Sequence, residues 1–77
     1  MAKIKWTPVD SSNLDAVSYD EALRQLAVRF KSNLKVYYVY AEVSPEKNQE
    51  FMSAPSQGSF LARQIKTQHE FTKVEGE

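Results

Sequence analysis

The spacing of apolar residues changes along the chain and divides it into a strand-rich part and a helix-rich part. Between residues 24 and 40, apolar side chains recur at every second position on two consecutive runs: Leu26, Val28, Phe30, Val36, Tyr38 and Tyr40. Such alternation predicts two β-strands that turn one face toward a core and the other toward solvent. The polar stretch at 31–34 predicts a hairpin turn, in which Asn33 can adopt a positive φ at lower cost than most residues if the tight turn needs one.

Further strands are expected outside the hairpin. Leu14–Tyr19 follows a polar turn of two serines and an asparagine, whose short side chains bond to nearby backbone groups. Phe71–Val74 is predicted to add a short final strand near the C-terminus. Pro8 limits any strand near Trp6, and this tryptophan is expected to pack onto the edge of the domain.

Two helices are predicted after the hairpin. The first begins at Ser44-Pro45-Glu46, where a serine N-cap, a proline at the first helical position and a carboxylate near the positive end of the helix dipole coincide. Pro55 disfavours helical geometry at the residue before it and should end this helix, and Ser56 can cap the second helix. The apolar residues expected to face the sheet are Phe51, Met52, Phe60, Leu61 and Ile65.

Strands that precede helices, rather than alternate with them, indicate an α+β fold. We predict an antiparallel β-meander of three or four strands, followed by two short helices packed on one sheet face. Because 77 residues form one domain at most, we assign residues 1–77 to a single domain with a core at about 9–74 and frayed ends at 1–5 and 75–77. The opposite sheet face would carry Gln25, Arg29, Lys31, Lys35 and Tyr37.

The charges are balanced overall but unevenly distributed. Ten Lys and Arg residues face ten Asp and Glu residues, whereas strong nucleic-acid binders usually have a clear basic excess. Residues 24–39 nevertheless contain four cations and no carboxylate. Between residues 55 and 69 the charged residues are Arg63 and Lys66. We therefore expect a modest basic patch.

Several classes of protein are disfavoured by composition. The chain has no Cys, which excludes disulfides and is typical of a reducing cytoplasm. No apolar run approaches the about 20 residues of a membrane span, and no signal peptide is recognisable. The single histidine, His69, is expected to be exposed, and no motif links it to a nucleophile or to metal ligands. We expect no enzymatic activity, no metal site and no cofactor.

Several short segments together resemble the KTSC domain family in their order and spacing. They are 9–14, Val17, Tyr19-Asp20, 38–40, Val43, 56–60 and Ile65-Lys66. The chain departs from the family pattern at Ser44, where proline is frequent, at Ala62, where asparagine is common, and in a hairpin turn without glycine.

The resemblance implies that Tyr38, Tyr40, Gly58, Phe60 and Ile65 are signature residues with a structural role. The family that the chain resembles is named for a segment found at the C-terminus of some lysyl-tRNA synthetases, and it also occurs as free-standing small bacterial or phage proteins. RNA binding is suggested for it only by association with the synthetases.

Two hypotheses for function remain open at this point. In the first, the chain is a small binding module that contacts RNA, with Tyr37 stacking on a base while Arg29, Lys31 and Lys35 hold phosphates. Arg63 and Lys66 would either extend this patch or serve a separate contact. The competing interpretation is that these residues form an ordinary solvated sheet face on which lysines discourage aggregation.

Tyr38 and Tyr40 lie two residues apart and would point to the same face of the sheet. They could stack on bases, or they could pack in the core beneath the helices.

The second hypothesis is a protein-interaction or self-assembly module. A β-meander has open edges, and an extended segment of another protein or of a second copy could pair with one of them.

Overall fold

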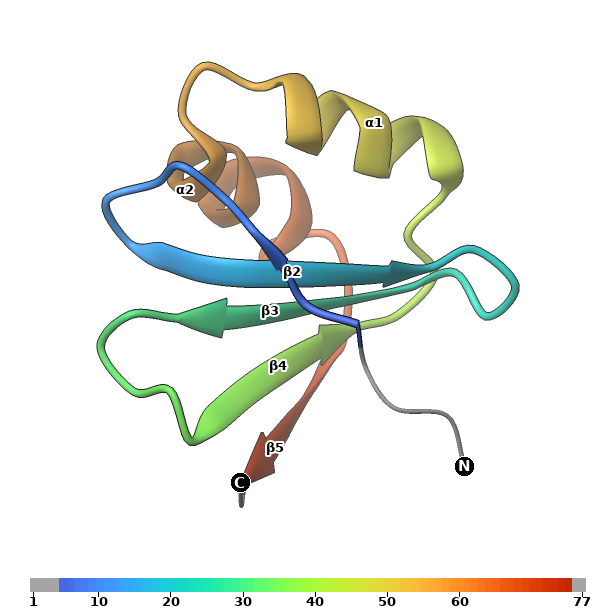
Figure 1. Cartoon of the computed structure of the whole chain (residues 1–77). Coiled ribbons are helices and arrows are strands. Elements are labelled where there is room, and N and C mark those ends of the chain that lie inside the picture. The colour runs from blue at the N-terminus through green and yellow to red at the C-terminus, as the bar shows by residue number, and fades with distance from the viewer. Residues whose placement is uncertain (1–4, 76–77) are drawn as a thin grey trace.

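The computed structural model describes residues 5–75 of the chain. The strands are β1 (Thr7–Pro8), β2 (Leu14–Asp20), β3 (Gln25–Phe30), β4 (Val36–Tyr40) and β5 (Phe71–Glu75). The helical segments are α1 (Pro45–Ser53), α2 (Gln57–Phe60) and the π-helical η1 (Leu61–Ile65), which follows α2 directly (Figure 1).

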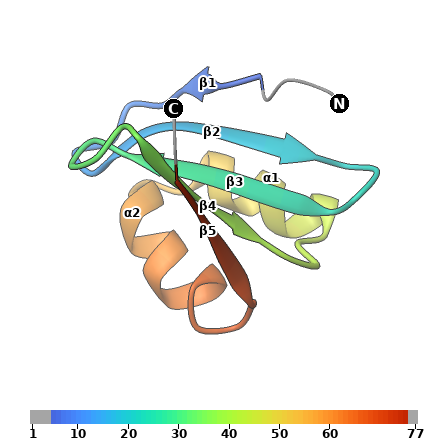
Figure 2. The ribbon, with the colours of Figure 1, turned by 90° about the horizontal axis from the view of Figure 1, so that it is seen from below.

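The five strands form one sheet in the order β1-β2-β3-β4-β5, and every neighbouring pair is antiparallel. Both α-helices lie on the same side of this sheet, and Figure 2 views the molecule from the other side, with α1 behind the strands. The predicted α+β class and the one-sided helix layer are therefore confirmed. The strand count is higher than predicted because β1 also pairs with β2, although Pro8 keeps β1 to two residues.

The ends of the chain differ in part from expectation. Residues 1–4 and 76–77, which were predicted to fray, lie outside the described residues. Glu75 was also expected to fray, but it is the last residue of β5 and pairs with Val36. The predicted final strand at 71–74 is thus confirmed and is one residue longer.

The register of the central hairpin matches the alternation in the sequence. Leu26 lies opposite Tyr40 and Val28 opposite Tyr38, so these four side chains point toward the helices. The intervening pairs, which include Arg29 with Tyr37, point to the helix-free side. Asn33 in the β3–β4 turn does not adopt a positive φ; within residues 5–75, the non-glycine residues with positive φ are Arg24 (55°), which precedes β3, and Glu42 (58°), which follows β4.

The helix boundaries follow the capping signals. The Ser44 hydroxyl accepts a hydrogen bond from Lys47 N (3.1 Å), and α1 ends before Ala54, which is extended because Pro55 follows it. The Ser56 hydroxyl accepts from Ser59 N (3.3 Å) and starts the second helical segment. This segment widens to a π-helix at Leu61–Ile65, closed by a hydrogen bond from Lys66 N to the carbonyl oxygen of Leu61.

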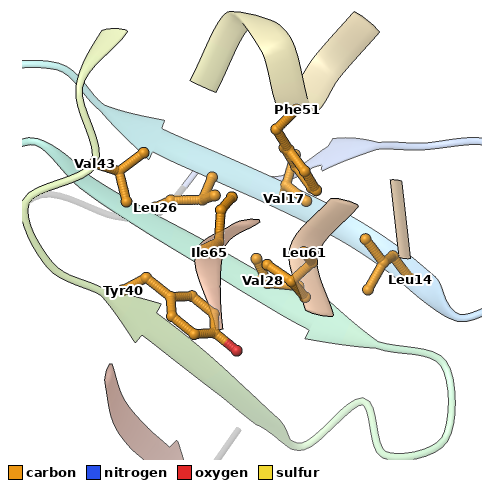
Figure 3. Close-up of a cluster of buried hydrophobic side chains, with 9 residues drawn as sticks. All are labelled: Leu14, Val17, Leu26, Val28, Tyr40, Val43, Phe51, Leu61 and Ile65. Atoms are coloured by element: carbon orange, nitrogen blue, oxygen red, sulfur yellow. The ribbon is translucent and has the colours of Figure 1, made fainter. Parts of the chain in front are cut away.

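The core lies between the sheet and the helices (Figure 3). Its buried residues are Leu14, Val17, Leu26, Val28, Tyr40, Val43, Phe51, Leu61 and Ile65. Met52 was predicted to join them, but 40% of it is exposed. Met52 lies about 100° around the helix axis from the fully buried Phe51, and this orientation leaves its side chain partly in solvent.

Two tyrosines in or beside the core have raised phenol pKa values. Burial raises the pKa of Tyr40 above its ordinary value of 10.0, and the neighbouring Tyr38 adds to this effect. Desolvation likewise raises the pKa of Tyr19, whose hydroxyl donates a hydrogen bond to the carbonyl oxygen of Val43. Both phenols are thus held in their neutral form.

We expect Phe51→Ala to lower the free energy of unfolding by about 3–5 kcal/mol, since it leaves a cavity at a fully buried site. Met52→Ala on the same helix is the matched control and should change it by about 0.5 kcal/mol or less. Urea denaturation followed by circular dichroism measures both. Ile65→Val, with an expected cost of about 0.5–1.5 kcal/mol, keeps the test quantitative if Phe51→Ala does not fold. Equal effects of the Phe51 and Met52 changes would contradict this core.

Stability should fall as the pH rises above about 10. The pKa values of Tyr19 and Tyr40 are higher in the folded state than in the unfolded state. At a pH between the two values, the folded state keeps phenolic protons that the unfolded state has lost. The free energy of unfolding therefore decreases as the pH rises through this range. Urea denaturation at several alkaline pH values measures this slope. The double variant Tyr19→Phe/Tyr40→Phe should show a shallower slope, and an unchanged slope would show that other groups dominate.

Candidate functional site

The helix-free side of the sheet carries a cluster of polar and aromatic side chains, which we call the open-face cluster: Trp6, Asp15, Arg29 and Tyr37. Arg29 lies on β3 and Tyr37 opposite it on β4. Asp15 is the extra residue of a β-bulge in β2, because Leu14 pairs with Phe30 while Ala16 pairs with Arg29. The bulge brings the Asp15 carboxylate next to the guanidinium of Arg29.

The charge of Arg29 is engaged within the protein. Its Nε donates to an Asp15 carboxylate oxygen at 2.9 Å, and its Nη2 lies 2.8 Å from the same oxygen; both side chains are about one-third exposed or less (26% and 32%). The guanidinium carbon also lies 4.7 Å from the centre of the Trp6 ring. The Trp6 ring in turn meets Tyr37 edge to face at 5.3 Å. The aromatic rings cover the ion pair rather than leaving the cation free.

The structure separates the residues predicted to contact RNA into three groups. Arg29 and Tyr37 belong to the open-face cluster. Lys31 and Lys35 are exposed in the β3–β4 turn, beyond the end of the sheet. Arg63 and Lys66 are exposed on the helical layer, on the other side of the sheet. Arg63 and Lys66 therefore do not extend the hairpin patch, because the sheet lies between them and Arg29.

Four of the five residues taken as the family signature lie in or against the core. Tyr40 and Ile65 are buried, and Tyr38 and Phe60 are partly buried against the core cluster. The ring of Tyr40 is thereby excluded from stacking on a base, as the packing alternative anticipated. Tyr38 meets Phe30 and Phe71 edge to face, with ring centres 5.7 and 5.5 Å apart.

Gly58 lies where two segments far apart in the sequence meet. A Cβ atom at this position would come within 3.3 Å of the Asn13 side-chain nitrogen. The two segments border a polar hollow of about 310 Å³, lined by Asp10, Ser11, Ser12, Asn13, Pro55, Ser56, Gln57, Gly58 and Ser59. The Ser11 and Ser56 hydroxyls accept hydrogen bonds from backbone N–H groups of their own segments, so both are already engaged where they line the hollow.

β5 forms a free outer edge of the sheet. Its residues pair with β4 on one side, and no other strand among residues 5–75 pairs with its outer side. Phe71 is 48% exposed although it contacts Tyr38 and Tyr40. Lys73 and Glu75 form an exposed ion pair of 3.5 Å along the strand.

The sequence prediction missed two contributions to these surfaces. Trp6 was expected at the edge of the domain, whereas it reaches across to Tyr37 on β4. Asp15 was not singled out, since a bulge that opposes Arg29 leaves no local signal. His69 was expected to be exposed but is half-buried, and its Nδ1 donates to the carbonyl oxygen of Ala41 at 2.9 Å.

Within residues 5–75, no three His, Asp or Glu side chains gather in a way that could hold a metal ion. None of the helices in this part of the chain is long and apolar enough to cross a membrane.

Comparisons with known proteins agree on the family. The model of the KTSC domain matches residues 10–69. A protein from Tsukamurella paurometabola is 41% identical over 54 residues, which cover 70% of this chain and 78% of that protein. The crystal structure of the KTSC domain protein YPO2434 from Yersinia pestis superposes with a TM-score of 0.84 at 32% identity, covering 94% of this chain and 99% of the other. The chain therefore belongs to the KTSC domain family.

Proposed function

We propose that this KTSC domain is a non-enzymatic protein-interaction module that takes an extended segment of another protein onto the free edge of β5. The observation that carries this proposal is the position of β5 as the last strand of the sheet, with the outer side of its five residues unpaired by residues 5–75. Strand addition supplies main-chain hydrogen bonds, and the side chains along the edge select the sequence.

The composition of β5 supports this use of its edge. The strand contains neither proline nor glycine, and four of its five residues are exposed. The opposite edge of the sheet is a poor alternative, because β1 has only two residues and one of them is Pro8, which lacks an N–H. Of the two outermost strands, β5 is therefore the longer one, and it offers an edge without proline to an extended segment.

The distribution of charge favours a protein over RNA as the partner. Arg29 is paired with Asp15. The other four cations of the predicted contact set form no ion pair with an acid of residues 5–75, and they lie in two groups, one in the β3–β4 turn and one on the helical layer. Phosphate binding needs several cations that act along one path.

Site-specific photocrosslinking in the native cell tests the edge. A photoreactive phenylalanine analogue at Phe71 should crosslink to a discrete protein, since this ring is exposed on the β5 edge. The same analogue at Leu23, which is 64% exposed in the β2–β3 turn, is the matched control and should not give that product. Mass spectrometry identifies the product and the crosslinked residue. No product at Phe71, or the same products at both positions, would overturn the proposal.

RNA binding is a second candidate function, favoured by one feature of the helix-free face. There, Trp6, Arg29 and Tyr37 form an aromatic and guanidinium surface, and the adjoining turn carries the exposed Lys31 and Lys35. Aromatic rings and guanidinium planes are the groups on which unstacked bases pack in single-stranded RNA. The family is also named for a segment of some lysyl-tRNA synthetases, and this association with tRNA-binding enzymes is a second reason to consider RNA.

If RNA binds there, affinity for labelled single-stranded RNA should fall steeply with salt. Replacing both Lys31 and Lys35 with Ser should reduce the slope of log K against log salt concentration by about 1.4, which corresponds to two lost phosphate contacts. The matched control replaces Arg63 and Lys66 with Ser and should leave the slope unchanged. Absence of binding at low salt, or binding without salt dependence, would exclude this candidate.

We also propose that the protein acts in the cytoplasm of a bacterium or in a phage-infected cell. The absence of Cys supports a reducing compartment, and the two similar proteins come from bacteria.

A further inference from the structure

We infer that the segment bound at β5 comes from a different protein, runs antiparallel to β5, and carries a carboxylate opposite Lys73 and an apolar side chain opposite Phe71. This inference rests on the proposed function and specifies the chemistry of the partner. It follows from the faces, charges and packing of the five β5 residues.

The register of β5 assigns its side chains to faces. Phe71 pairs with Tyr40 and Lys73 with Tyr38, so these residues and Glu75 point to the helix side of the sheet. Thr72 and Val74 point to the helix-free side, where Val74 pairs with Tyr37. A sixth strand would continue both faces, because residues directly opposite each other point to the same side.

Phe71 offers an apolar contact for such a strand. Its ring lies 5.5 Å from Tyr38 and 5.7 Å from Tyr40, yet 48% of the residue remains exposed. The side chain is thus only partly covered, at the outer edge of the sheet. An apolar or aromatic side chain opposite Phe71 would pack against this ring and continue the aromatic contacts that Phe71 makes with Tyr38 and Tyr40.

Lys73 selects the charge of the partner. Its side chain is half-exposed (50%), and the acid that contacts it is Glu75 on the same strand, at 3.5 Å. A carboxylate opposite Lys73 would form a favourable cross-strand pair, whereas a lysine there would be repelled. By the same logic, a cation suits the position opposite Glu75.

The central position of Lys73 disfavours a second copy of this chain as the occupant. Full antiparallel overlap of residues 71–75 with themselves would place Lys73 opposite Lys73 of the second copy. A lysine on an edge strand is a common device against self-association. An antiparallel segment from a different protein avoids this repulsion, and it continues the arrangement of the four existing strand pairs.

A pair of designed peptides tests whether the bound segment carries a carboxylate opposite Lys73. The glutamate peptide contains Lys-Val-Glu-Thr-Trp, which in antiparallel register sets Lys opposite Glu75, Glu opposite Lys73 and Trp opposite Phe71. The lysine peptide replaces the Glu by Lys. Titration into the ¹⁵N-labelled protein should shift the amide signals of residues 71–75, and the glutamate peptide should bind roughly three- to tenfold more tightly at low salt.

The variant Lys73→Glu supplies the reciprocal control. Because Lys73 is exposed, this variant should keep the dispersed amide spectrum of the folded protein. Its preference between the two peptides should reverse, so that the lysine peptide binds more tightly. A reversal cannot come from a general loss of stability.

The outcomes separate the two levels of the proposal. If both peptides shift the β5 signals equally in both proteins, strand addition stands and the charge rule is overturned. If neither peptide shifts them, edge addition itself fails for these sequences, and with it the inferred partner chemistry. If sedimentation shows that the protein alone forms a dimer whose formation Lys73→Glu alters, the occupant is a second copy and the inference is wrong.

Discussion

The pairing of β3 with β4 is the constraint on which the rest of the structure depends. Leu26 opposite Tyr40 and Val28 opposite Tyr38 place one continuous apolar surface under the helices. A slip of one residue would turn this surface to solvent and bring Arg29 beneath α1 and η1. The hairpin register therefore decides both where the core forms and which polar groups remain available on the other side.

Because the helices cover only one side of the sheet, two surfaces of the sheet remain without a helix: its other face and its outer edge at β5. On the helix-free side, the protein covers the middle strands with its own N-terminal segment, through Trp6 over Arg29 and against Tyr37. At the outer edge, β5 extends beyond the helices, and Phe71 remains half-exposed although it packs on two tyrosines. The first surface is covered within the chain, whereas the outer side of the second has backbone groups that no strand of residues 5–75 pairs with. This difference is why the edge, rather than the face, carries the proposed function.

The ion pair of Arg29 with Asp15 changes the role that the sequence alone suggests for Arg29. In the sequence, Arg29 stands among cations with no carboxylate nearby and looks like part of a basic patch. In the structure, a bulge fourteen residues away supplies a carboxylate at 2.8 Å. A partly exposed pair of this kind contributes modestly to stability, but it removes a free cation from the surface.

The sequence by itself determined the hairpin, both helix starts and the α+β class, because alternation, capping residues and proline act locally. It also determined that Phe30 and Lys35 point to different environments. Only the tertiary structure decided that Met52 and Phe71 stay exposed, that Trp6 reaches β4, and that β5 forms the outer edge. Those outcomes depend on which distant segments meet and on how far a short helix layer can extend over a five-stranded sheet, and neither is encoded in the spacing of neighbouring residues.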